Sequence, residues 1–163
     1  MKDSRVATIV NIGDELLNGQ RLNSNLHWLS KELLKIDVST KKAVCVRDNI
    51  SEIKEELSKA SDSKYVFITG GLGGTVDDVT VDAISSFLKS EVYFDEKYYA
   101  KLKKIFNKKS LKVDDSLKKQ AMKIKGVKYF SNHVGTALGF SFKIERSCYF
   151  VFPGVPKEMK YIF

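Results

Sequence analysis

The sequence predicts an α/β protein in which helices cover both faces of a mainly parallel β-sheet. Short apolar runs rich in β-branched residues have the length and composition of buried strands. Between them lie longer segments whose apolar residues recur every three or four positions, as on one face of an amphipathic helix. The two kinds of segment alternate through the first half of the chain, and such alternation produces right-handed crossovers between parallel strands. The expected architecture therefore has three layers, with the sheet between two layers of helices.

The first half of the chain carries this alternating pattern. Residues 5–12 (RVATIVNI) predict a buried strand, and the next helix has Leu26, Leu29 and Leu33 on one face. The predicted strands are 5–12, 38–46 and 65–69, and the predicted helices are 23–36, 51–60 and 79–88. Ligands bind beyond the carboxyl ends of parallel strands. The loops that follow residues 12 and 68 are therefore expected at a ligand-binding edge.

The second half of the chain is predicted to add further strands and two lysine-rich helices. Strands are expected at 91–94, 128–130, 139–144 and 148–152, and helices at 96–107, 115–122 and 157–163. Residues 145–147 suit a tight turn, so the last two strands should form a C-terminal β-hairpin. The sequence has no internal repeat, and its two prolines both lie within residues 153–156. We therefore predict a single domain over residues 1–163.

Composition excludes several classes of protein. The chain has 163 residues, of which 43% are hydrophobic, as in an ordinary globular domain. No stretch reaches the roughly 20 apolar residues that cross a membrane, and the N-terminus lacks the apolar segment of a signal peptide. We expect a cytoplasmic protein with no membrane partner. Cys45 and Cys148 should be reduced core thiols, and together with His27 and His133 they are too few and too scattered for a zinc site.

The formal charge of +8 is concentrated in one region. Twelve lysines between Lys97 and Lys128 are accompanied only by Asp114 and Asp115. Such a region is either a solvated helical face or a patch that attracts nucleic acid. We favour the solvated face, since arginine is almost absent there and the aromatic signatures of RNA-binding modules are missing. Nucleic acid is therefore an unlikely partner on this prediction.

The segment from Thr69 to Thr80 (TGGLGGTVDDVT) is the strongest functional signal. Its four glycines allow the backbone to turn sharply and to approach a ligand closely. The helix that follows presents free amides with partial positive charge, which suit phosphate. The segment lacks the Gly-Lys-Ser/Thr of a Walker A loop. The residues expected to contact a phosphate-bearing ligand are Thr69, Gly70, Gly71, Gly73, Thr75 and Thr80.

Asp77 and Asp78 follow these glycines directly. Either aspartate could cap the next helix, but a cap accounts for only one of them. Two carboxylates beside a phosphate would repel it unless a cation lay between them. Mg²⁺ binds through one or two carboxylates together with phosphate oxygens. We therefore predict a metal or ligand role for this pair.

Three other loops carry polar residues and glycines. The first, GDELLNGQ at residues 13–20, offers Asp14 as a further metal ligand, and Asn23 beyond it could instead cap a helix. The second is NHVGTALG at residues 132–139, and the third is PGVPKEM at residues 153–159. Each could equally be an ordinary turn. The candidate ligand-binding residues are Gly13, Glu15, Asn23, Asn132, Gly135, Thr136, Gly154 and Glu158.

Together these four segments resemble the CinA family, and specifically its N-terminal domain, which belongs to the MoaB/MogA molybdopterin-binding group. The resemblance extends from residue 5 to residue 163, and Lys119-Gln120-Ala121 also resembles a family segment. Three residues depart from the pattern, because Gly74, His133 and Leu138 stand where the family usually has proline. A glycine in place of proline would make the ligand loop more flexible.

The resemblance implies a MoaB/MogA-like fold and two alternative activities. The first is hydrolysis of ADP-ribose that depends on a divalent metal (Mg²⁺, or Mn²⁺ or Co²⁺), with Asp77 and Asp78 as catalytic residues and Asp77, Asp78 and Asp14 as metal ligands. The second is binding or adenylylation of molybdopterin. A nucleic-acid binder without catalytic activity is the weakest alternative. The group commonly forms dimers or trimers, so a homo-oligomer is expected. The deamidase domain of longer CinA proteins has no counterpart in this sequence, and no deamidation is predicted.

Overall fold

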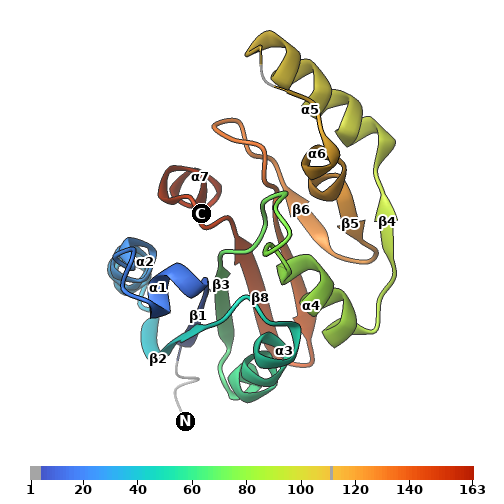
Figure 1. Cartoon of the computed structure of the whole chain (residues 1–163). Coiled ribbons are helices and arrows are strands. Elements are labelled where there is room, and N and C mark those ends of the chain that lie inside the picture. Colours follow the sequence, from blue (N-terminus) through green and yellow to red (C-terminus); the bar gives the residue numbers. More distant parts are fainter. Residues whose placement is uncertain (1–4, 111) are drawn as a thin grey trace.

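The computed structural model describes residues 5–110 and 112–163, and a six-stranded sheet forms its centre (Figure 1). The strand order is β2-β1-β3-β8-β7-β6. These strands are β1 (Val6–Ile12), β2 (Ser39–Val46), β3 (Tyr65–Thr69), β6 (Lys128–Phe130), β7 (Gly139–Ile144) and β8 (Ser147–Phe152). The pairs β1–β2, β1–β3 and β3–β8 are parallel, whereas β7 runs antiparallel to both of its neighbours. The mainly parallel sheet and the C-terminal hairpin of β7 and β8 are thus confirmed.

Helices cover both faces of this sheet (Figure 1). On one face lie α2 (Ser24–Lys35) and α7 (Pro156–Ile162), and on the other lie α3 (Ile50–Lys59) and α4 (Thr80–Leu88). A short 3₁₀ turn, Ala60–Asp62, follows α3. Leu29, Leu33 and Met159 are fully buried in the first interface, together with Ile9 and Phe67 of the sheet. The predicted three-layer arrangement is therefore confirmed.

The second interface holds the larger apolar core. Ile53 and Leu57 of α3 and Ile84 of α4 have no exposed surface, and they lie against sheet residues such as Ile68 and Val151. Burial of one such side chain contributes about 1.5–3 kcal/mol. The spacing of three and four between apolar residues, from which these helices were predicted, is therefore the spacing that fixes them to the sheet.

Strand register aligns the carboxyl ends of the parallel strands. Asn11 of β1 pairs with Thr69 of β3, and Thr69 pairs with Phe152 of β8. Parallel strands in this register end at the same level, so the segments after β1, β3 and β8 emerge side by side. The adjacent strand β2 ends there too, because Ile12 pairs with Val46. The expectation that the loops after residues 12 and 68 share one edge is confirmed.

An arm outside the main sheet departs from the prediction. It consists of β4 (Val92–Phe94), α5 (Glu96–Lys108), α6 (Asp115–Gln120) and β5 (Met122–Ile124). The predicted helix 115–122 ends at Gln120, because Met122 already belongs to β5, a strand that the sequence analysis missed. Strands β4 and β5 pair antiparallel, and Leu102 of α5 and Leu117 of α6 form a small core of their own.

Other sequence predictions concern the surface. Most lysines between Lys97 and Lys128 are exposed, as expected for a solvated face. Cys45 and Cys148 are free thiols, but both are half-buried instead of lying fully in the core. No helix in the described ranges is long and apolar enough to cross a membrane.

Candidate ligand-binding pocket

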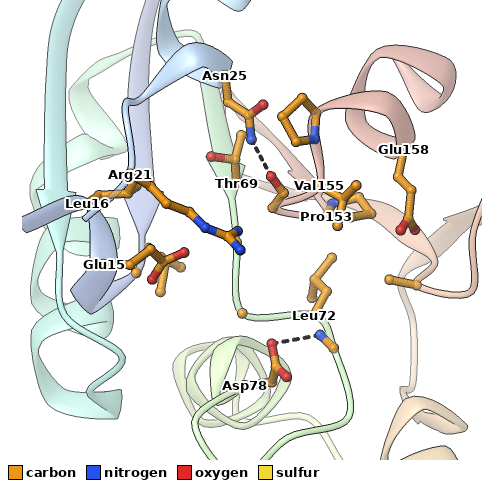
Figure 2. Close-up of a pocket in the computed structure, with 18 of the residues that line it drawn as sticks. Glu15, Leu16, Arg21, Asn25, Thr69, Leu72, Asp78, Pro153, Val155 and Glu158 are labelled. Carbon is orange, nitrogen blue, oxygen red and sulfur yellow. Dashed lines mark hydrogen bonds between the residues drawn. The ribbon is translucent and has the colours of Figure 1, made fainter. Parts of the chain in front are cut away.

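A pocket of about 440 Å³ lies at the carboxyl edge of the parallel strands (Figure 2). Its wall is built from segments that follow β1, β2, β3 and β8, with contributions from α6 and from the loop before β7. Of the residues predicted to form the site, those that line this pocket are Gly13, Glu15, Asn23, Thr69, Gly70, Gly71, Gly73, Thr75, Asp77, Asp78, Thr136, Gly154 and Glu158. Asp14, Thr80, Asn132 and Gly135 do not line it.

The glycine loop begins with a backbone that only glycine accommodates. Gly70 has a φ of 108°, and a Cβ atom there would lie 2.1 Å from the carbonyl oxygen of Ile12. The Thr80 hydroxyl donates to the Gly70 carbonyl at 2.9 Å, and the Thr80 amide donates to the Gly71 carbonyl at 3.2 Å. Thr80 is fully buried. It was predicted to contact the ligand, but its hydroxyl is already bonded and fixes the shape of the loop.

Asp78 closes the glycine loop on itself. One carboxylate oxygen accepts the Gly73 amide at 2.8 Å, and the other accepts the Thr75 amide at 2.8 Å and the Thr75 hydroxyl at 2.6 Å. Asp78 does not cap α4, whose N-cap residue is Val79 with no side-chain bond. Two amides expected to bind phosphate are therefore engaged by a carboxylate of the chain. Asp77, next to it, is exposed and lines the pocket.

Helix α6 supports the same loop from outside. The Lys119 ammonium donates to the carbonyls of Thr75 (2.6 Å) and Val76 (3.1 Å). A Cβ atom at Gly74 would lie 2.3 Å from the carbonyl oxygen of Ser116. Gly74, predicted to loosen the loop, is therefore the residue that lets α6 approach it closely.

The loop after β1 forms a short helix, α1 (Asp14–Leu17), at the pocket wall. Its first amide, that of Asp14, donates to the Asp48 carboxylate at 3.0 Å. Asp14 itself is exposed and outside the lining, whereas Asp48, from the segment after β2, lines the pocket. Sequence analysis missed Asp48, although its place directly after a parallel strand could have identified it.

Burial raises the pKa of Asp48 above its ordinary value, and the Asp14 amide partly opposes this by lowering it. The negative charges of Asp14, Glu15 and Asp78 raise the pKa of Asp48 further. The rim of the pocket is thus crowded with carboxylates that interact with one another.

Two asparagines join α2 to the pocket. Asn23 accepts the Leu26 amide at 3.0 Å and so caps α2, the structural role left open by the sequence. Asn25 donates to the Gly154 carbonyl at 2.8 Å, which holds the segment after β8 against α2 (Figure 2). A Cβ atom at Gly154 would lie 3.3 Å from Cα of Gly70, so Gly154 allows the two ligand loops to meet.

Asn132 organises the remaining wall although it is buried outside the lining. Its oxygen accepts the amides of Val134 and Gly135, both at 3.0 Å, and its NH₂ group donates to the Ala137 carbonyl and to the Glu158 carboxylate. A Cβ atom at Gly135 would lie 2.1 Å from Cδ of Glu158. These two residues therefore position Glu158 at the pocket, which is why they do not face the cavity themselves.

Tyr98 of the arm anchors the same loop. Its hydroxyl donates to the Thr136 carbonyl at 2.6 Å. Burial raises the pKa of Tyr98, and the nearby charge of Glu158 raises it further, so the hydroxyl stays protonated as a donor. The arm thus contacts the pocket wall through Tyr98 and the glycine loop through Lys119.

The chain's own donors do not enclose a metal ion. Within residues 5–110 and 112–163, no group of three or more His, Cys, Asp or Glu side chains is placed to hold one. Mg²⁺ usually retains waters and needs only one or two carboxylates when phosphate oxygens complete its shell. Three aspartates line the pocket, Asp48, Asp77 and Asp78, and Asp78 already accepts three hydrogen bonds from the glycine loop.

Comparison with known proteins identifies the family. The model of a family described as "Probable molybdopterin binding domain" matches residues 8–163. The chain belongs to this family. Among the curated relatives of this chain, a "Putative competence-damage inducible protein" of Halalkalibacterium halodurans and a "CinA-like protein" of Cytophaga hutchinsonii are each 36% identical over 94% of the chain. The chain spans about 37% of the length of each.

Solved structures agree with this assignment. The crystal structure of CinA from Thermoplasma acidophilum, a protein described as having unknown function, superposes on this chain with a TM-score of 0.86 at 28% sequence identity. The superposition covers 97% of this chain and 93% of the CinA chain. The MoaB structure from Pyrococcus furiosus superposes with a TM-score of 0.60 at 18% identity, over 98% of this chain and 88% of its own, and so shows the same fold. The predicted resemblance to CinA and to the MoaB/MogA group is confirmed.

Proposed function

We propose that the pocket binds a phosphate-bearing nucleotide or pterin, and that the chain hydrolyses the diphosphate of ADP-ribose when a divalent metal is present. One observation carries the proposal: a single pocket combines the glycine loop with carboxylates from the segments after β1, β2, β3 and β8. Backbone amides suit a diphosphate, and carboxylates suit the cation that accompanies it.

The residues divide into binding and supporting functions. Among the described residues, the amides of Gly71 and Leu72 donate to no protein acceptor, which leaves them for phosphate. Glu158, held by Asn132, and the Thr136 backbone, held by Tyr98, form the wall where a sugar would lie. Asp77, Asp78 and Asp48 would hold the metal, with Asp14 fixing Asp48 through its amide.

A divalent ion bound at these carboxylates would neutralise charge on the diphosphate and polarise its oxygens. The chain would orient the diphosphate along the glycine loop. Asp78 already engages two amides of that loop. Because of those bonds, the loop holds its shape before a ligand arrives, and less ordering is required on binding.

Product analysis tests the proposal. Enzyme in large excess over ADP-ribose, with Mg²⁺, Mn²⁺ or Co²⁺, should release AMP and ribose 5-phosphate, which chromatography separates from the substrate. Chelation of the metal should stop the release. Absence of AMP with all three metals would refute hydrolysis.

A second candidate uses the same pocket for molybdopterin. The description of the matched family names this ligand, a pterin that carries phosphate. Calorimetry that shows binding of molybdopterin but none of ADP-ribose would favour this candidate, and transfer of AMP from ATP to the pterin would add adenylylation. Binding of nucleic acid by the lysines between Lys97 and Lys128 is the least supported alternative. It requires an affinity for DNA or RNA that falls steeply with salt.

The assembly state is also a proposal. We propose a homo-oligomer, a dimer or trimer, on the basis of the family. Light scattering on the purified chain tests it, and a mass equal to 18.5 kDa, that of one chain, would contradict it.

A further inference from the structure

The pocket has an unbalanced set of charges. Its lining contains five carboxylates, those of Glu15, Asp48, Asp77, Asp78 and Glu158. Of the described residues, Arg21 is the only cation that lines the pocket. The charged side chains of the lining are therefore net negative, and among the described residues only Arg21 adds a positively charged side chain to the attraction of the loop amides for an anion.

Local hydrogen bonds fix the position of the Arg21 backbone, from which the side chain extends. The chain turns after α1 at Gly19, where φ is 71°, and the Arg21 amide then donates to the Glu15 carbonyl at 3.1 Å. Asn23 caps α2 two residues later. Leu22 between them is 90% exposed and lies at the open side of the pocket, which it helps to line. Arg21 is thus held between two anchored positions, and Figure 2 shows its side chain extending into the pocket, between Glu15 and Leu72.

The guanidinium group of Arg21 is not engaged by the protein. No hydrogen bond or ion pair joins it to any residue in the part of the chain that the structure describes. Three of the five carboxylates of the lining have hydrogen-bond partners of their own: Asp78 is bonded to loop amides, Glu158 to Asn132, and Asp48 to the Asp14 amide. The positive charge of Arg21 is therefore free to meet a ligand.

We propose that Arg21 is the phosphate-binding side chain of this pocket and that it selects diphosphate ligands over uncharged ones. This inference rests on the proposed function. A guanidinium fork binds two phosphate oxygens at once, which adds geometric specificity to the attraction of charge. The diphosphate would lie between this fork and the glycine loop. Arg21 lies within the first family-like segment, between Gln20 and Asn23, but it is not one of the residues on which the resemblance was based.

Arg21 also allows the diphosphate to bind to the pocket without the metal. Without a counter-charge, the carboxylates of the lining would repel a diphosphate, and binding would require the metal. With Arg21 in place, the chain binds the diphosphate when the metal has been removed, and the metal then adds to that affinity.

Calorimetry on the full chain tests this inference. The ligands are ADP-ribose, inorganic pyrophosphate and adenosine, each measured with a chelator and again with Mg²⁺. The variants are Arg21→Gln, Arg21→Lys and a matched control, Arg146→Gln. Arg146 lies in the turn between β7 and β8 and does not line the pocket. Both arginine-to-glutamine changes remove one charge, so they differ only in position.

We expect Arg21→Gln to weaken the binding of ADP-ribose and pyrophosphate by about 10- to 100-fold in chelator, the loss of a charge-assisted pair of hydrogen bonds. Arg21→Lys should fall between wild type and Arg21→Gln, because lysine keeps the charge without the fork. Adenosine affinity should stay unchanged in every variant, and Arg146→Gln should bind all three ligands as wild type does. Since the guanidinium has no protein partner, the melting temperature of each Arg21 variant should match that of wild type.

The outcomes separate this inference from the proposed function. If ADP-ribose binds wild type and Arg21→Gln with affinities within twofold, the inference is overturned while the proposed function stands. If wild type binds pyrophosphate through Arg21 but does not bind ADP-ribose, the proposed function fails and the assignment of Arg21 survives. If wild type binds neither, both are overturned.

Discussion

Substitution of Gly135 by alanine tests how the pocket wall is assembled. The new Cβ atom would lie 2.1 Å from Cδ and 2.2 Å from Oε2 of Glu158. Carbon atoms in contact are about 3.5–4.0 Å apart, so the carboxyl group must retreat by more than about 1 Å. That movement breaks its bond to Asn132, whose NH₂ group keeps only its bond to the Ala137 carbonyl.

The expected cost follows from these contacts. A hydrogen bond to a charged group contributes about 1.5–3 kcal/mol, toward the lower end in this case because Glu158 is half-exposed. Alanine also lowers the conformational entropy of the unfolded chain relative to glycine, which stabilises the folded protein by about 0.4–1 kcal/mol. The net loss of about 1 kcal/mol should lower the melting temperature by about 2–4 °C in a protein of this size. With Glu158 displaced, ADP-ribose affinity should fall about tenfold, as measured by calorimetry.

Gly126→Ala is the matched control. Nothing lies within 4 Å of a Cβ atom at Gly126, but its φ of 77° costs an alanine about 1–2 kcal/mol. It should therefore lose similar stability without any change in ligand affinity, since Gly126 does not line the pocket. A Gly135→Ala protein with wild-type stability and affinity would refute the packing argument. A destabilised protein with wild-type affinity would remove Glu158 from the ligand site.

Three further substitutions probe the loop and its charges. Asp78→Asn should keep the fold but weaken the hydrogen bonds of the glycine loop, and chemical denaturation should show a loss of about 1–3 kcal/mol in the free energy of unfolding. The same variant should lose metal-dependent turnover, and unchanged turnover would exclude Asp78 from the site. Lys119→Met should free the carbonyls of Thr75 and Val76, and hydrogen exchange of the loop amides should then accelerate; exchange at the wild-type rate would show that Lys119 does not hold the loop. Asp48→Asn should raise the melting temperature at pH 7, because the raised pKa of Asp48 means that its ionised form disfavours the fold. The protonated carboxyl of Asp48 does not disfavour the fold, so this part of the stability is fully present below the ordinary pKa of 3.8 and is lost as pH rises through the raised pKa. The gain in melting temperature from Asp48→Asn should therefore shrink as pH falls from 7 toward 4. A gain that does not depend on pH would contradict the raised pKa of Asp48.

The fold was predictable because its strongest signals are local. The apolar spacing of Leu29 and Leu33, and the β-branched run of β1, each specify one element without reference to the rest of the chain. Strand β5 was missed because three residues carry too little pattern, and its pairing with β4 depends on a partner distant in sequence. Strand order was likewise beyond the sequence, since β8 inserts beside β3 only in three dimensions.

The site was predictable where a glycine allows two backbone segments to approach each other closely, as at Gly70 and Gly154. Thr80 and Asn132 were predicted to bind the ligand, because a hydroxyl or amide in a loop can form a hydrogen bond either to a ligand or to the protein itself. Only the observed partners, the Gly70 carbonyl and the Glu158 carboxylate, distinguish these alternatives. Asp48 was overlooked because a single acid after a strand has no motif around it.

The pairing of β3 with β8 has a consequence for biogenesis. Tyr65 lies opposite Cys148, so two neighbouring strands of the sheet are separated by half of the chain. A ribosome must therefore release β8 before the sheet can close, and contacts so distant in sequence slow folding. The glycine loop emerges early, but its facing wall, Gly154 and Glu158, is synthesised only after the hairpin of β7 and β8. A nascent chain that stops before this wall lacks one side of the pocket, so the complete lining is present only when translation has passed Glu158.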